Sequence, residues 1–142
     1  MSIFLSHALG YAGQGLHVFP LKPRSKAPLT KSGFKDASAD KEKILHWWTQ
    51  YPEANIGLAT GSISGFWVLD VDGTYPPEFP SLPKPTVKTM KGYHYYFRCP
   101  DATLIKNRTK LFGAAVDVRG DGGYIVAPPS IHPDGGVYEF VS

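Results

Sequence analysis

The chain has 142 residues, and its 15 basic and 12 acidic side chains give a formal net charge of +3. Apolar residues make up 42% and charged residues 19%, values that exclude a disordered chain and predict a single folded domain. One cysteine excludes an intramolecular disulfide and a cysteine-rich zinc site, and no apolar run or basic leader indicates a membrane span or signal peptide. We therefore expect a cytoplasmic protein without a membrane partner.

The first half of the chain predicts two helices, each followed by a strand. Apolar residues recur with helical spacing from Ile3 to Ala12, and glycines follow directly, as they do after many helix C-termini. Ser38 or Asp40 is a candidate N-cap for the second helix, which Pro52 would stop. The expected elements are a helix over 3–12, a strand over 16–21, a basic loop over 22–35, a helix ending at 51 and a strand over 55–60.

The second half predicts strands separated by turns rich in glycine and proline. The glycines of residues 120–123 lie between two apolar runs, a pattern typical of a β-hairpin, and the prolines of residues 73–85 indicate an irregular connection. Two helices beside these strands indicate an α+β fold with a mixed, largely antiparallel sheet and flanking helices. The expected strands are 66–72, 86–98 (one strand, or a hairpin around residues 91 and 92), 114–119, 124–127 and 137–141.

Two acids end the apolar strand over residues 66–72. Side chains alternate along a strand, so Asp70 and Asp72 share one face and lie about 7 Å apart along the backbone. Neighbouring carboxylates repel each other, and hard cations such as Mg²⁺ or Mn²⁺ bind such oxygen ligands. The pair is equally consistent with a strand end that turns into solvent.

Two later strands carry polar residues opposite an apolar face. Alternation places His94 opposite an aromatic face, where a lone histidine is more often structural, and it places Asp117 and Arg119 opposite two valines. An acid between two valines is costly in a core but useful as a ligand. If the strands are neighbours, Asp70, Asp72 and these three residues gather in one place. Such a set suits two-metal phosphoryl or nucleotidyl transfer.

Several segments carry a recognisable pattern in a fixed order. They are Asp-Val-Asp-Gly at 70–73, Thr-Met-Lys-Gly-Tyr-His-Tyr-Tyr-Phe at 89–97 and Val-Asp-Val-Arg-Gly-Asp-Gly-Gly-Tyr-Ile-Val-Ala-Pro-Pro-Ser at 116–130. Together with Phe-Pro-Leu-Lys-Pro at 19–23, Asn-Ile-Gly-Leu-Ala-Thr-Gly at 55–61 and the tail over 130–138, they resemble the bifunctional DNA primase/polymerase (Prim-Pol) family of the archaeo-eukaryotic primase superfamily. The resemblance extends over nearly the whole chain.

This resemblance implies a fold and a chemistry. The implied fold is an archaeo-eukaryotic primase-like, RRM-related catalytic core, with residues 1–142 as the N-terminal domain of a larger replication protein. Asp70, Asp72 and Asp117 match the acids that bind two Mg²⁺ or Mn²⁺ ions, without zinc, and His94 matches a histidine that contacts the nucleotide's phosphates. The implied reaction makes and extends primers on single-stranded DNA from dNTPs or NTPs, with release of pyrophosphate, in plasmid or phage replication. A helicase domain or replication partner would supply unwinding.

Further nucleotide contacts are expected around that site. Lys91, Arg119 and Lys26 offer positive charge to a triphosphate or a template phosphate. Each lysine is equally consistent with a solvated surface. Ser130 follows two prolines on a loop beside the site and is expected to contact the nucleotide rather than to act as a nucleophile.

Two other interpretations stay open at this point. The string Val-Leu-Asp-Val-Asp-Gly-Thr at 68–74 is also similar to the nucleophile motif of haloacid dehalogenase-like phosphatases, with Asp70 as nucleophile and Asp72 as acid–base. That family places the motif on the first strand of a parallel sheet. The second interpretation is a non-catalytic nucleic-acid- or nucleotide-binding module, in which the acids hold a structural cation or have no function.

Overall fold

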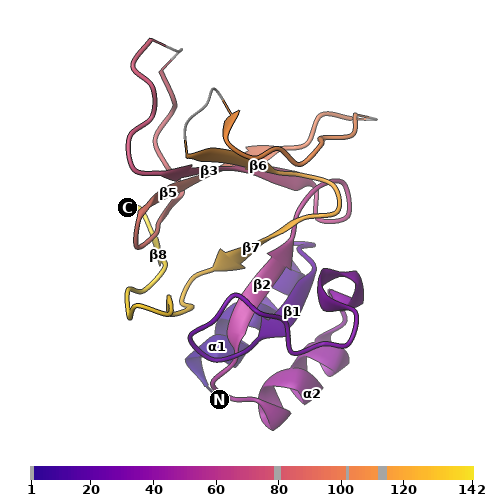
Figure 1. The fold of residues 1–142 in the computed structure, drawn as a ribbon. Helices are drawn as coiled ribbons and strands as arrows, with labels where there is room; N and C mark the ends of the chain where they lie inside the picture. The colour runs from indigo at the N-terminus through magenta and orange to yellow at the C-terminus, as the bar shows by residue number, and fades with distance from the viewer. Residues whose placement is uncertain (1, 79–80, 102, 112–114) are drawn as a thin grey trace.

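The structure is a computed structural model that describes residues 2–78, 81–101, 103–111 and 115–142. Within these residues the chain forms two α-helices, one short 3-10 helix and eight strands in two sheets (Figure 1). The strand pairs are antiparallel. In chain order the elements are α1 (Ile3–Gly13), β1 (Val18–Leu21), η1 (Gly33–Asp36), α2 (Lys41–Gln50), β2 (Asn55–Ala59), β3 (Phe66–Asp72), β4 (Val87–Lys88), β5 (Gly92–Arg98), β6 (Val116–Arg119), β7 (Tyr124–Ala127) and β8 (Glu139–Phe140).

Sheet A, in the order β1-β2-β7, and the two helices form one half of the molecule. Each helix begins at a side-chain cap: Ser2 accepts a hydrogen bond from the N–H of Leu5, and Asp40 accepts one from the N–H of Glu42, both at 3.1 Å. Every residue of β1 and β2 is buried. Trp48, 1% exposed, lies in the same core and donates its indole N–H to the carbonyl of Ala54.

Sheet B, in the order β6-β3-β5-β4-β8, has β3 between β5 and β6. We call the face of this sheet that carries Asp70 the inner face and the opposite one the outer face. Along the inner face of β3, Phe66 and Val68 join the main core, whereas Asp70 and Asp72 follow on the same side of the strand. The inner face is therefore apolar at one end of β3 and polar at the other.

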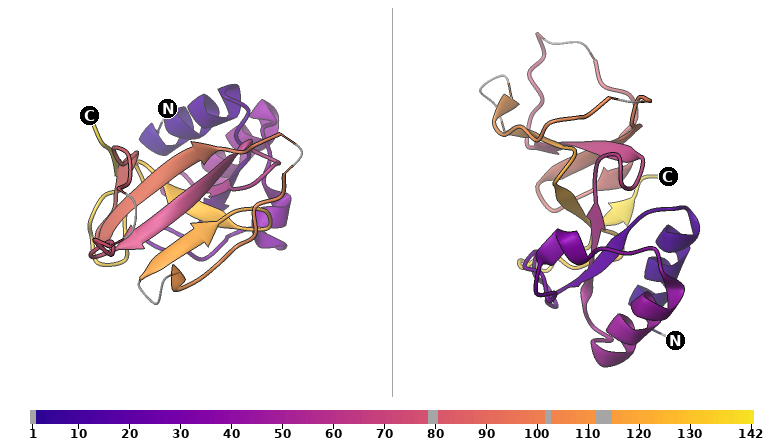
Figure 2. Two further views of the ribbon diagram at one scale, coloured as in Figure 1. Left: turned by 90° about the horizontal axis from the view of Figure 1, so that it is seen from above. Right: turned by 90° about the vertical axis from the view of Figure 1, so that its right-hand side faces the viewer.

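The outer face of sheet B has a separate apolar cluster. Its buried members are Leu69, Val71, Val116 and Val118. Loop side chains pack against them, among them Tyr75, Leu82 and Leu111. The two helices lie at the end of the molecule away from β3, β5 and β6, with sheet A between (Figures 1 and 2).

The prediction of a hairpin over residues 114–127 is wrong. β6 pairs with β3 in sheet B, whereas β7 pairs with β2 in sheet A, so residues 120–123 cross between the sheets. A glycine is required at the start of this crossing, because a Cβ at Gly120 would lie 2.2 Å from the carbonyl oxygen of Ile105. Residue 114 of the expected strand, like residues 79 and 80 of the expected irregular connection, lies outside the described residues.

The α+β class is confirmed, but two antiparallel sheets replace the one mixed sheet that was expected. Asp40, not Ser38, caps α2, and residues 86–98 divide into β4 and β5. The phosphatase interpretation requires its motif strand in a parallel sheet, and β3 is antiparallel to both of its neighbours. In the part of the chain that is described, no helix is both long and apolar enough to span a bilayer.

Candidate active site

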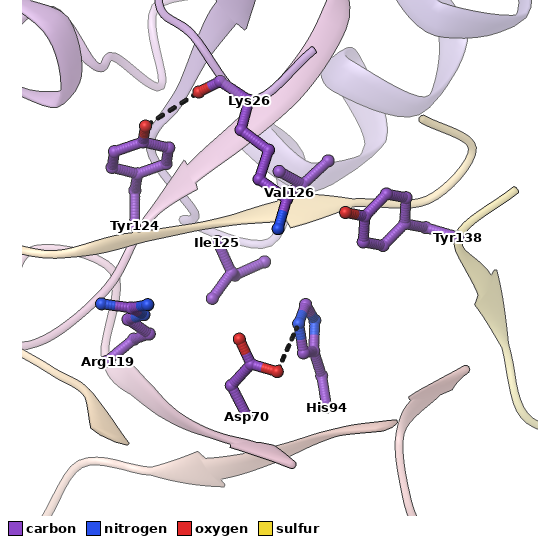
Figure 3. A pocket seen from close by; sticks show the side chains of 8 residues that line it. All are labelled: Lys26, Asp70, His94, Arg119, Tyr124, Ile125, Val126 and Tyr138. Atoms are coloured by element: carbon purple, nitrogen blue, oxygen red, sulfur yellow. Dashed lines mark hydrogen bonds and ion pairs between the residues drawn. The ribbon is translucent and has the colours of Figure 1, made fainter. Parts of the chain in front are cut away.

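Asp70 lies where three strands present polar side chains next to one another. In the register of sheet B it is directly opposite His94 on β5 and Asp117 on β6. His94 is only 5% exposed, and its Nε2 lies 3.5 Å from Oδ1 of Asp70, an ion-pair distance (Figure 3). The adjacency of the three strands thus brings together residues that are 24 and 47 positions from Asp70 in the sequence.

The carboxylate of Asp70 is held in its charged form although it is largely enclosed. Burial raises its pKa, but His94, Arg119 and Lys26 together outweigh burial and leave the pKa below its usual value. Oδ1 of Asp70 and Nδ1 of His94 are buried without a hydrogen-bond partner. A buried carboxylate oxygen without a donor is unfavourable. Oδ1 of Asp70 therefore has its 3.5 Å ion-pair contact with His94 but no hydrogen bond, which leaves it short of donors.

Asp72 ends β3 on the same face, and its pKa is shifted in the opposite direction. Burial and the charge of Asp70 raise the pKa of Asp72, while Lys26, His94 and Lys91 partly offset the increase. Two neighbouring carboxyl groups with pKa values pushed apart are typical of functional sites.

A cavity of about 180 Å³ lies between the inner face of sheet B and β7. Asp70, His94 and Arg119 line it from sheet B, and the side chain of Lys26 points into it from the opposite side (Figure 3). The hydroxyl of Tyr124 donates to the carbonyl of Lys26 at 2.8 Å, which fixes the turn that carries this lysine. Cations therefore face Asp70 from two sides of the cavity.

A smaller cavity of about 40 Å³ shares Lys26, Asp70 and His94 with the first. Asp72 and Lys91 also line it, so two of the sequence-predicted residues that the larger cavity lacks are found here. The remaining lining residues are Thr89, Met90, His132 and Tyr138.

Tyr138 and His132 were not expected at the site. Tyr138 is 3% exposed and lines both cavities, with its ring centroid 6.1 Å from that of His94 and 6.3 Å from that of His132. Burial, and then the charges of Asp70 and Asp72, raise the pKa of Tyr138 to about 12, so it stays protonated at neutral pH. Both residues lie in the tail segment whose pattern contributed to the family resemblance, and that pattern is the signal that could have identified them.

Asp117 is next to Asp70 in the sheet but lines neither cavity. Its Oδ1 accepts a hydrogen bond from the N–H of Lys110 at 3.0 Å, and its Oδ2 accepts one from Nη2 of Arg119 at 3.1 Å. Across the described residues, no three histidine, cysteine, aspartate or glutamate side chains are placed as a ready metal-binding group. The three acids are therefore neighbours without converging on one point.

Ser130 is fully buried and lies outside the lining of both cavities. Its hydroxyl accepts a hydrogen bond from the N–H of Ile56 at 2.8 Å, and it thereby joins the segment after β7 to β2. The structure thus places Ser130 in the framework behind the site.

This geometry suits an anionic substrate. Lys26, Arg119 and His94 offer donors to phosphate oxygens around a carboxylate that remains charged. A metal ion bound by the carboxylate side of the cavity would allow phosphate oxygens and acids to be close neighbours.

A family model described as "Bifunctional DNA primase/polymerase, N-terminal" (Prim-Pol) matches residues 8–142. The match includes all eight strands and every residue named above at the two cavities. It confirms the resemblance that the sequence motifs indicated. A comparison with curated proteins gave no match.

Proposed function

The chain belongs to the bifunctional DNA primase/polymerase family, and from this membership we propose that it makes and extends primers on single-stranded DNA. The reaction is nucleotidyl transfer. The 3′-hydroxyl oxygen of a primer or initiating nucleotide attacks the α-phosphorus of an incoming dNTP or NTP and loses its proton. The bond from the α-phosphorus to the bridging oxygen breaks, and pyrophosphate leaves.

The observation that carries the proposal is the surroundings of Asp70. This half-buried, charged carboxylate lies between His94 and Asp117 on adjacent strands, and Lys26 faces it across the cavity. A carboxylate with cations on both sides of the cavity is what a metal-bound triphosphate requires.

The donor set fits divalent cations. Oδ1 of Asp70 is buried and has no hydrogen bond besides its 3.5 Å contact with His94. Asp72 lines the same small cavity, and carboxylate oxygens are preferred ligands of Mg²⁺ and Mn²⁺. We assign Asp70 and Asp72 as ligands and Asp117 as a third, which has to exchange Arg119 and the N–H of Lys110 for the ion. Two such ions would lower the pKa of the attacking hydroxyl and stabilise the leaving pyrophosphate.

The other residues position the triphosphate. Lys26 and Arg119 bind phosphate oxygens from opposite sides of the larger cavity, and Lys91 does so at the smaller one. His94 is held by Asp70 and contacts a phosphate from within the sheet. Tyr138 keeps its proton beside two carboxyl groups and acts as a neutral hydrogen-bond donor. Catalysis by these residues consists of positioning and charge stabilisation.

We further propose that the core is primase-like and that the chain is one domain of a plasmid or phage replication protein with a helicase partner. The antiparallel environment of β3 favours this proposal over the phosphatase interpretation. A non-catalytic binding module would retain the cavity but would not turn substrate over.

The test is a primer-synthesis assay with single-stranded template, dNTPs or NTPs, and Mg²⁺ or Mn²⁺. We expect products longer than one nucleotide, and we expect Asp70→Asn to reduce their formation at least about 100-fold, because charge stabilisation through bound metal is worth several kcal/mol. Glu53→Gln is the matched control, since it removes one exposed carboxylate beyond the end of α2.

Full activity of Asp70→Asn would contradict the proposal. Template binding by the unsubstituted chain without any product would favour the binding module. Release of phosphate from small phosphoesters without template would favour the phosphatase.

A further inference from the structure

We propose that the outer face of sheet B carries a second contact for single-stranded nucleic acid, in a groove beside Trp67. The inference rests on the proposed function in one respect, because the strand in this groove is the continuation of the template in the cavity. The groove has a volume of about 390 Å³. It is lined by Trp67, Leu104, Ile105, Lys106, Arg108 and Val118.

The floor of the groove is aromatic and apolar. Trp67 on β3 is partly exposed and stacks on Phe97 of β5, with ring centroids 4.6 Å apart and an interplanar angle of 26°. At the rim, Leu104 is 74% exposed, which is unusual for a large apolar side chain. A partly exposed indole with an apolar rim is a suitable platform for an unpaired base.

The wall of the groove is basic. Lys106 and Arg108 are exposed, and neither forms an ion pair with any acid in the described residues. Asp121 is hydrogen-bonded to this wall, and its carboxylate accepts from the N–H groups of Ser62 and Ile105. The positive charge of the wall is thus available to phosphates.

The backbone that presents the two basic residues is held in place on both sides. The N–H of Ile105 donates to Asp121, the side chain of Asn107 accepts from the N–H of Gly120, and Arg108 exchanges two backbone hydrogen bonds with Val118. The segment over residues 105–108, which lies beside β6, is therefore ordered before any ligand arrives, and this lowers the entropic cost of binding.

The groove and the catalytic cavity lie on opposite faces of sheet B, and residues of β6 line both of them. Arg119 faces the cavity from the inner face, and Lys110 donates its N–H to Asp117 at the edge. Arg108, which pairs with β6 through its backbone, lines the groove on the outer face, the face seen in the left view of Figure 2. A nucleic-acid strand that passes around this edge would meet Arg119 on the inner face, and Arg108 and Lys106 beside Trp67 on the outer face.

Single-stranded nucleic acid is the occupant that satisfies both features of the groove. Its bases stack on a partly exposed indole, and its phosphates neutralise Lys106 and Arg108. A protein partner would need an acidic segment with an aromatic or aliphatic anchor, and such a partner is the alternative that the test separates.

The test measures binding of 5′-labelled oligothymidines by fluorescence anisotropy, in EDTA and over a range of salt concentrations. One oligonucleotide has about 5 nucleotides and the other about 20, so that only the longer one extends beyond a single site. The variants are Lys106→Gln/Arg108→Gln and Trp67→Leu. The control, Lys41→Gln/Lys43→Gln, removes the same charge from exposed positions on α2.

For the long oligonucleotide, we expect the double variant to weaken binding at least about fivefold and to reduce the salt slope by about 1.4, which corresponds to two phosphate contacts. We expect Trp67→Leu to weaken it about fivefold or more through lost stacking. Binding of the short oligonucleotide, the thermal unfolding midpoint of the double variant and binding by the α2 control should stay unchanged.

Unchanged binding and salt slope in both variants would overturn the inference. An equal loss for the short oligonucleotide would also overturn it, because the effect would then lie in the catalytic cavity or the fold. Since no turnover is measured, a chain that synthesises no DNA but shows the expected differences would contradict the proposed function and leave the groove assignment supported.

Discussion

At the scale of single residues, the site depends on how one carboxylate is kept charged in an enclosed position. Burial raises the pKa of Asp70, and the surrounding His94, Arg119 and Lys26 outweigh that effect and lower the pKa below its usual value. The same Arg119 also holds Asp117 through its Nη2 atom. Arg119 therefore acts on two of the three acids, and it competes with any cation that these acids bind.

This competition predicts opposite effects of Arg119→Gln on two ligands. The substitution frees Asp117 and makes the site more negative, so affinity for Mn²⁺ alone should rise. The gain should be up to about fivefold, because a partly exposed ion pair is worth at most about 1 kcal/mol. Affinity for dATP should fall, because one phosphate contact is lost. Isothermal titration calorimetry measures both affinities.

The control for this prediction is Arg119→Lys, which keeps the charge and loses only the planar fork. It should change the affinity for Mn²⁺ less than Arg119→Gln does. If both variants leave Mn²⁺ affinity unaltered, Asp117 is not a ligand. If dATP binds Arg119→Gln as tightly as before, Arg119 is not a phosphate contact.

At the scale of secondary structure, strand alternation determines the site and could be predicted locally. The period of two placed Asp70, His94 and Asp117 on polar faces without knowledge of the fold. The partner of each strand is a non-local property, and the glycine-rich segment over 120–123 was therefore expected to form a hairpin when it is a crossing. The same limit applies to side chains such as Tyr138, whose place beside His94 depends on contacts over 44 positions of sequence.

The pairing of β3 with β5 depends on a close approach at Gly92. A Cβ at this position would lie 1.9 Å from the carbonyl oxygen of Val71, a backbone atom that cannot rotate away. Gly92→Ala should therefore separate the strands beside Asp72. We expect the free energy of unfolding to fall by at least about 2 kcal/mol and primer extension to fall at temperatures where the variant is still folded. Urea denaturation and the extension assay measure the two effects.

Gly10→Ala is the matched control on α1. No atom lies within 4 Å of a Cβ built there, and alanine favours the helix over glycine by up to about 1 kcal/mol. This variant should be at least as stable as the unsubstituted chain. Wild-type stability of Gly92→Ala would show that β3 and β5 can move apart without cost, and the register on which the site depends would not be fixed by this glycine.

At the scale of the whole molecule, the cavity depends on how the two sheets are held relative to each other. The chain passes from sheet A to sheet B between β2 and β3, and it returns between β6 and β7. Asp121 joins these two crossings, because its carboxylate accepts hydrogen bonds from the N–H and the hydroxyl of Ser62. It also accepts one from the N–H of Ile105 on the connection before β6.

This connection predicts a pH-dependent contribution to stability. The hydrogen bonds from the Ser62 N–H, the Ile105 N–H and the Ser62 hydroxyl lower the pKa of Asp121 in the folded state, more than burial raises it. A group with a lowered folded pKa stabilises the fold above its unfolded pKa of about 3.9, and this contribution is lost as the pH falls through the folded value.

Asp121→Asn should therefore lower the thermal midpoint at pH 7 by about 3 °C, equivalent to about 1 kcal/mol. The difference from the unsubstituted chain should shrink below about pH 4. Asp101→Asn, at an exposed position, should show neither effect. If the difference in thermal midpoint between Asp121→Asn and the unsubstituted chain stays the same in acid, the charge of Asp121 does not hold the crossings together.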